Sequence, residues 1–115
     1  MSSANSGSPE LTMLGIETRV IKEFLDIIML CELKERGELT GYDLAVLEKE
    51  KFGVSLSPGT VYMTMYAMER RGLITGKPNG KKTTYSLTLK GERALEEIKA
   101  SGSGLVEYMR CIFPF

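Results

Sequence analysis

The stretch that decides the fold runs from Ser57 to Tyr85 and reads SPGTVYMTMYAMERRGLITGKPNGKKTTY. Ser57 is a preferred residue just before a helix, and Pro58 suits the first helical position, where its missing N–H is not needed. Gly72 follows Arg71 and is typical of a residue that ends a helix in a left-handed conformation. The stretch therefore begins with a predicted helix from Pro58 to Arg71.

Two predicted strands follow this helix, over Leu73–Pro78 and Lys82–Leu87, and they flank Asn79 and Gly80. An Asn-Gly pair is the strongest short signal for a two-residue type I′ hairpin turn. A helix that leads into a basic hairpin is the plan of a winged helix-turn-helix, in which the helix enters a DNA groove and the hairpin contacts the backbone beside it. The predicted fold is mainly α with a small β-hairpin wing.

The predicted helix has two distinct faces. At about 100° per residue, Val61, Met65 and Met68 share one side, which we expect to pack inward. Apolar groups beside an arginine form the opposite side, with residues Met63, Tyr66, Ala67 and Arg70. Such a side suits a contact surface, because arginine bonds guanine edges and apolar groups meet the thymine methyl. The alternative is that Met63 and Tyr66 pack against another part of the protein.

Charge is segregated along this chain of 115 residues, whose length fits one domain and whose formal net charge is zero. Between Ser57 and Tyr85 there are five basic residues and one acid, Glu69, so this segment carries +4 and the rest −4. The five bases are Arg70, Arg71, Lys77, Lys81 and Lys82. A local excess of positive charge is what an electrostatic footprint on nucleic acid requires.

The composition argues against an enzyme and against a bound cofactor. The chain has no histidine, the commonest general base and metal ligand, and its two cysteines, Cys31 and Cys111, are far apart. We expect both to be buried thiols, or to form a bridge or redox switch if both lie between subunits. From these missing ligands we expect no metal and no cofactor. No signal peptide and no membrane-spanning run are visible, so we expect no membrane and a cytoplasmic location.

The N-terminal part is predicted to contain a disordered tail over residues 1–11 and a helix over Thr18–Arg36, with a start one or two turns earlier as the alternative and an end at Gly37. This helix has apolar residues in nearly every direction. Thr40 and Asp43 form a capping-box pair that opens a second helix, and Leu39 before it fits a minimal strand beside the wing. In that helix Tyr42 is favoured as a core ring, and the alternative is a hydroxyl that reaches a phosphate.

The C-terminal part, residues 89–115, is predicted to be a dimerisation helix that follows a DNA-binding domain over residues 12–88. Its apolar residues alternate at spacings of three and four if Gly102 fills one position, which is a short heptad seam. Ser101–Gly104 contains two glycines, each of which costs about 1 kcal/mol inside a helix. Since the register continues across them, one long helix is favoured over two helices with a break.

Several motifs together resemble the PadR family of transcriptional regulators, and they cover Leu39 to about Leu95. They are LTGY at 39–42, SPGTVY at 57–62, ERRGLI at 69–74, YSLT at 85–88 and Gly91. The resemblance, to short members with a single C-terminal helix, implies a homodimeric repressor whose first and last helices form the dimer interface. Some short members bind small apolar compounds between the subunits. Met63 and Tyr66 stand where the family commonly has proline and a basic residue, so the operator sequence does not carry over.

The predicted partners are double-stranded DNA with a pseudo-palindromic operator and a second copy of the chain. The resemblance also puts Tyr42, Pro58, Gly59, Thr60 and Tyr62 at or near the DNA. We expect base contacts from Met63, Tyr66 and Arg70, and mostly phosphate contacts from Ser57, Thr60, Tyr62, Lys77, Lys81 and Lys82, with Asn79 in the hairpin along the backbone or minor groove. The expected dimer interface contains Phe24, Ile28, Leu95, Ile98, Gly102, Leu105, Met109, Ile112 and Phe113.

Two questions stay open on the sequence. A small apolar effector would bind among Phe24, Ile28, Leu105, Met109 and Phe113, and the alternative is a dry, filled interface. The rival to a DNA-binding regulator is a winged-helix adaptor that contacts proteins without binding DNA.

Overall fold

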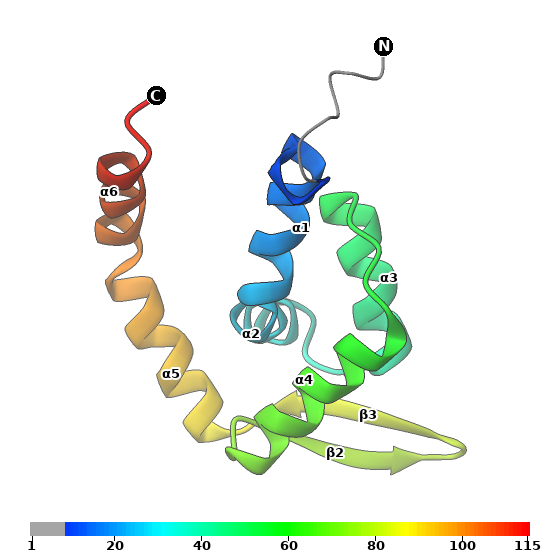
Figure 1. The fold of residues 1–115 in the computed structure, drawn as a ribbon. Coiled ribbons are helices and arrows are strands. Elements are labelled where there is room, and N and C mark those ends of the chain that lie inside the picture. Colours follow the sequence, from blue (N-terminus) through cyan, green and yellow to red (C-terminus); the bar gives the residue numbers. More distant parts are fainter. Residues whose placement is uncertain (1–8) are drawn as a thin grey trace.

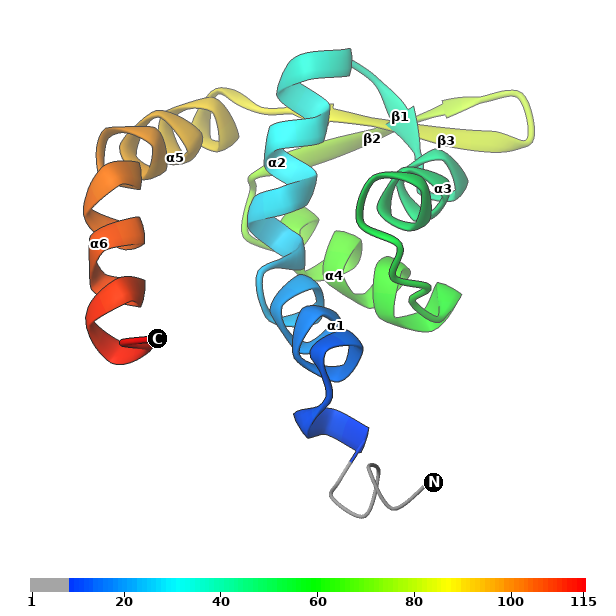
Figure 2. The same ribbon diagram turned by 90° about the horizontal axis from the view of Figure 1, so that it is seen from above.

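The computed structural model describes residues 9–115 and confirms a mainly helical fold with a small antiparallel sheet (Figure 1). The chain order is η2 (Pro9–Leu11), α1 (Met13–Glu23), α2 (Leu25–Arg36), β1 (Leu39–Thr40), α3 (Gly41–Phe52), α4 (Pro58–Arg70), β2 (Ile74–Asn79), β3 (Lys82–Leu87), α5 (Leu89–Ala100) and α6 (Gly102–Ile112). The β2–β3 hairpin projects beyond the helices in both views (Figures 1 and 2). This is a winged helix-turn-helix with additional helices at its ends.

Side-chain caps begin helices α3, α4 and α5. Thr40 Oγ1 accepts the Asp43 N–H at 3.0 Å and Asp43 Oδ2 accepts the Thr40 N–H at 3.0 Å, a complete capping box. Ser57 caps α4 and Thr88 caps α5 in the same manner. The predicted helix ends at Gly37 and Gly72 are also confirmed, because both glycines have positive φ, and Gly53, also with positive φ, ends α3.

The core lies between α2, α3, α4 and the sheet, with Leu95 of α5 closing one side. The inner face of α4 is as predicted, because Val61, Met65 and Met68 are each at most 1% exposed. From the other elements the core takes Leu25, Met29, Leu33, Leu44, Val54, Ile74 and Tyr85. The predicted minimal strand at Leu39 is also confirmed.

The sheet has the order β1-β3-β2, so β2 is an edge strand. The expected Asn79–Gly80 turn is wrong by one residue, since Asn79 pairs with Lys82 and the two loop residues are Gly80 and Lys81. Of these two loop residues only Gly80 has a positive φ, 66°, which fits a type II′ turn with glycine first rather than type I′. Asparagine thus ends the strand, and Lys81 occupies the tip of the wing.

The N-terminal helix has the earlier of the two expected starts and differs from the prediction in its continuity. It begins at Met13 and divides at Phe24 into α1 and α2, which run in different directions (Figures 1 and 2). No glycine or proline marks the division, so periodicity alone could not reveal it. The predicted tail of residues 1–11 is replaced at Pro9–Leu11 by a short 3-10 helix, and residues 1–8 lie outside the described part.

The single long C-terminal helix is wrong, because Ser101 separates α5 from α6. The backbone of Ser101 leaves the helical region, with φ −102° and ψ 2°, at the start of the Ser-Gly-Ser-Gly stretch. A Cβ added at Gly102 would meet nothing within 4 Å, so its own chain provides no packing to offset the glycine cost. None of the α6 residues is buried.

Two buried carboxylates lie in the helical core. Glu32 of α2 is 3% exposed and binds Lys51 Nζ at 2.6 Å and Arg36 Nε at 3.4 Å. Glu48 of α3 is 1% exposed, and among the described residues neither of its oxygens has a hydrogen-bond partner. The two acids therefore differ in that only Glu32 is neutralised by bases.

Both cysteines lie at the surface of the single chain. The prediction that Cys31 and Cys111 are buried is wrong within one chain, because both are exposed. No helix within residues 9–115 has the length and apolar character needed to cross a membrane.

Candidate nucleic-acid interface

The start of α4 presents a pair of hydroxyl groups. Ser57 Oγ accepts the Thr60 N–H at 3.1 Å and lies 2.8 Å from Thr60 Oγ1, so one of the two hydroxyls donates a hydrogen bond to the other. Pro58 and Gly59 are exposed beside them, and a Cβ on Gly59 would meet only the Ser57 Oγ. Small exposed residues and helical N–H groups at this end suit close approach of a phosphate.

A tyrosine cluster continues this surface along α4. The Tyr62 ring packs over Gly41 at the start of α3, where an added Cβ would lie 2.5 Å from Tyr62 Cε1. Tyr62 and Tyr66 place their ring centroids 6.2 Å apart. Tyr42 is 73% exposed, so the favoured core position is wrong and its hydroxyl is free to contact another molecule.

The outward face of α4 has no cover from the described chain. Met63 is 72% exposed, and Tyr66 is 48% exposed beside the Tyr62 ring, so neither side chain is buried within one chain. Arg70 is exposed on the same face and takes part in no ion pair within residues 9–115. Arg71, by contrast, turns toward Asp26 at 3.8 Å.

The wing presents its basic residues on one face and at its tip. Strand alternation puts Lys77, Asn79 and Lys82 on the hairpin face opposite Ile74 and Tyr85, which belong to the core. All three are exposed, as is Lys81 in the turn. None of the three lysines forms an ion pair within the described chain, so their charges are available to a polyanion.

One acid interrupts this basic surface at the end of α4. Glu69 Oε2 accepts the Gly76 N–H of β2 at 3.1 Å, which joins the helix to the wing. Burial, and then the negative charge of Glu69, raise the pKa of Tyr85 above its usual value. Glu69 and Gly41 were not among the predicted site residues. The one indication of a role for Glu69 in the sequence is that it is the only acid among five bases between Ser57 and Tyr85.

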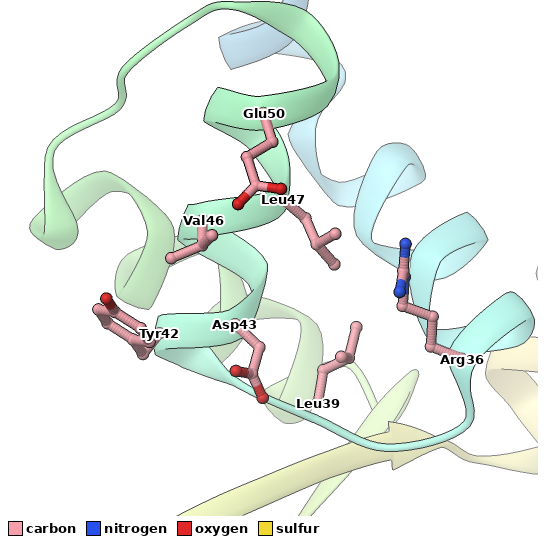
Figure 3. A pocket seen from close by; sticks show the side chains of 7 residues that line it. All are labelled: Arg36, Leu39, Tyr42, Asp43, Val46, Leu47 and Glu50. Carbon is pink, nitrogen blue, oxygen red and sulfur yellow. The ribbon is translucent and has the colours of Figure 1, made fainter.

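An open hollow lies beside this surface, between α3 and the end of α2 (Figure 3). Tyr42 stands at one end and Arg36 at the other, and Asp43 and Glu50 add negative charge between them. Asp43 is already engaged by Thr40, and Arg36 is paired with Glu32. The acids repel phosphates, so the hollow is not part of the basic surface.

The residues expected in a dimer interface fall into two groups. Leu95 is 1% exposed inside its own chain, so it belongs to the core and leaves no surface for a partner. Phe24, Leu105, Ile112 and Phe113 are between 39% and 51% exposed. The remaining residues are partly exposed: Ile28, Ile98, Gly102 and Met109.

The model of the family described as "Transcriptional regulator PadR-like family" matches residues 29–97. No curated protein matches the chain. Among solved structures, a putative transcriptional regulator from Thermoplasma acidophilum has 22% identity and a TM-score of 0.72, and the match covers 84% of this chain and 97% of that one. A PadR family regulator from Clostridium difficile has 26% identity and a TM-score of 0.67, with 80% and 99% covered.

A third similar structure is Bacillus subtilis PadR in complex with operator DNA. It has 30% identity and a TM-score of 0.55, and the match covers 64% of this chain and 45% of that one. The family match itself runs from α2 through the wing to α5 and covers more than half of the sequence. The protein therefore belongs to the PadR-like family of transcriptional regulators.

Proposed function

We propose that the protein binds double-stranded DNA sequence-specifically as a homodimer in the cytoplasm and represses transcription. The observation that carries this proposal is the uncovered outer face of α4, where Met63, Tyr66 and Arg70 lie together beside unpaired wing lysines. A helix used only for packing would present charged or polar residues on its exposed face, not methionine and tyrosine. An adaptor that binds proteins remains the rival function, and the wing charge distinguishes the two.

In this proposal α4 enters the major groove and the wing lies along the backbone or minor groove. Met63, Tyr66 and Arg70 read base edges. The phosphate contacts come from Tyr42, Ser57, Thr60, Tyr62, Lys77, Lys81 and Lys82, with Pro58, Gly59 and Asn79 close to the DNA. Two copies read a pseudo-palindrome whose half-sites lie about one helical turn apart.

The test is a mobility-shift series over increasing salt with DNA from upstream of the protein's own gene. Changing Lys81 and Lys82 to alanine should weaken binding to all sequences and flatten the salt slope by about two units per protomer, if each lysine contacts one phosphate. Lys49→Ala is the control, because Lys49 is exposed in the last turn of α3. That end of α3 lies away from the wing (Figure 1). Unchanged DNA affinity in the double variant would favour the adaptor.

Base readout has its own variant. Arg70→Ala should cost about 1–3 kcal/mol per contact and relax the sequence preference. A uniform loss on operator and unrelated DNA would instead assign Arg70 to a phosphate. Repression is tested separately, by a promoter–reporter whose activity should rise when the protein is removed.

The homodimer is supported by apolar side chains that their own chain leaves open. The α6 face contains Leu105, Val106, Ile112 and Phe113, and a groove at the α5–α6 bend is lined by Ala94, Glu97, Ile98, Ser101 and Leu105. A second copy can cover these surfaces.

Apolar effector binding among Phe24, Ile28, Leu105, Met109 and Phe113 is tested by thermal-shift screening with aromatic compounds. A dry interface predicts no shift.

A further inference from the structure

We propose that Glu69 is a positioning residue that fixes the wing relative to the recognition helix, so that both reach DNA as one unit. This inference rests on the proposed DNA-binding function. Glu69 lies in the last turn of α4 and Gly76 in the first half of β2, so a bond between them joins the two elements expected to contact DNA.

The bond uses a backbone group that the sheet leaves free. β2 is bonded to β3 on one side only, and the Gly76 N–H points away from that partner to Glu69 Oε2 at 3.1 Å. The connection from α4 to β2 otherwise runs through Arg71, Gly72 and Leu73. The hairpin is also held by the pairing of β1 with β3 and by the buried side chains of Ile74 and Tyr85. The Glu69 bond adds an attachment on the outer edge of β2, and this restricts how the strand can move relative to the end of α4.

Gly76 is fitted to this arrangement. An added Cβ would lie 3.0 Å from both Thr83 Cγ2 and Tyr85 Cε1, and 3.3 Å from Glu69 Oε2. The Tyr85 ring is buried, so it cannot move aside freely. A side chain at this position would push the strand away from the carboxylate, and glycine allows the close approach.

The charge of Glu69 opposes DNA binding, and this makes a positioning role testable. A carboxylate within a segment of five bases repels nearby phosphates. If Glu69 acted only through its charge, any neutral replacement would strengthen binding equally. If it positions the wing, a replacement that keeps the hydrogen-bond acceptor will differ from one that removes it.

The experiment compares two charge-matched variants, Glu69→Gln and Glu69→Ala, in the full-length protein. Glutamine keeps a carbonyl oxygen for the Gly76 N–H, and alanine does not. The DNA affinity of Glu69→Ala should be about 2- to 10-fold lower than that of Glu69→Gln, the factor expected for loss of one hydrogen bond. Its salt slope should also be flatter, because misplaced wing lysines contact fewer phosphates.

Amide hydrogen exchange at Gly76 in the free protein gives a readout without DNA. Exchange should be faster in Glu69→Ala than in the wild type and Glu69→Gln. Equal DNA affinities for the two variants, or equal Gly76 exchange in all three proteins, would overturn the proposal. If the wild type bound no DNA, the proposed function would fail, while the exchange rates would still decide whether Glu69 holds the wing.

Discussion

Helices α4 and α6 both present apolar side chains outward, but they differ in what holds them in place. The inner face of α4 is completed by its own chain, where Val61, Met65 and Met68 are buried. In α6 no residue is buried, and the helix stands apart from α1–α4 in both views (Figures 1 and 2). The position of α4 is thus determined within one chain, whereas the apolar side chains of α6 stay uncovered in one chain and would be buried in the proposed dimer.

The difference assigns separate tasks to the two helices. The exposed residues of α4 are the outer half of a helix already fixed by its core, so they can serve recognition without being needed for folding. The exposed residues of α6 are its entire apolar surface, so their burial in a dimer would contribute to stability. The predictions below separate these two tasks.

The largest effect is expected from removing α6 by ending the chain after Ser101. The truncated protein should be monomeric or aggregated, and its operator affinity should fall about 100-fold or more because two half-sites are no longer bound together. Sedimentation measures the association state, and thiol labelling of Cys31 should become faster if the interface had covered it.

A chain that ends after Phe113 is the control for this truncation, because it keeps all of α6. It should remain dimeric. A full-length protein that sediments as a monomer at micromolar concentration would contradict the dimer prediction.

The two faces of α4 are compared by matched substitutions of neighbouring methionines. Met65→Ala should lower the free energy of unfolding by about 2–5 kcal/mol, because it leaves a cavity at a position that is 0% exposed. Met63→Ala should change stability by less than about 0.5 kcal/mol and still weaken operator binding. Urea unfolding and mobility shifts measure the two effects. Similar stability losses in both variants would remove the distinction between the faces.

Glu48 makes the stability of the core sensitive to pH. Burial, and then the charge of Glu32, raise its pKa from 4.5 to about 7, and Lys51 opposes this shift. A raised pKa means that the folded state holds the proton more tightly, so this contribution to stability is complete below pH 4.5 and is lost as the pH rises to about 7. The loss is about 3 kcal/mol, from roughly 2.5 pKa units at about 1.4 kcal/mol each.

Glu48→Gln isolates this contribution, since glutamine has the same shape and does not titrate. Relative to the variant, the wild type should lose stability between about pH 4.5 and pH 7, as measured by urea unfolding at each pH. Parallel pH profiles for the two proteins would show that Glu48 is not protonated in the folded state.

The sequence predicted the parts of the fold that depend on local chemistry. Caps at Thr40, Ser57 and Thr88 and the inner face of α4 follow from residue type and helical spacing, and the structure has them. It could not place the division at Phe24, which no glycine or proline marks. The sequence also predicted an unbroken helix at Ser101, because the heptad register of apolar residues continues across the two glycines.

The site was predictable in its location but not in its connections. Exposure of Met63, Tyr66 and Arg70 followed from the helical wheel, and the structure places them on one open face. The Tyr62–Gly41 contact and the Glu69–Gly76 bond each join residues of two different elements. Such pairings depend on tertiary packing, which local patterns do not encode.

The open edge of β2 has a consequence for solubility. An exposed strand edge can recruit strands from other molecules and begin aggregation, and proteins commonly block it with proline, lysine or a covering group. Here Pro78 supplies no N–H, Lys77 adds charge, and Glu69 occupies the N–H of Gly76. The opposite edge, β1, has only two residues. The small sheet is therefore protected from edge-to-edge association at both sides.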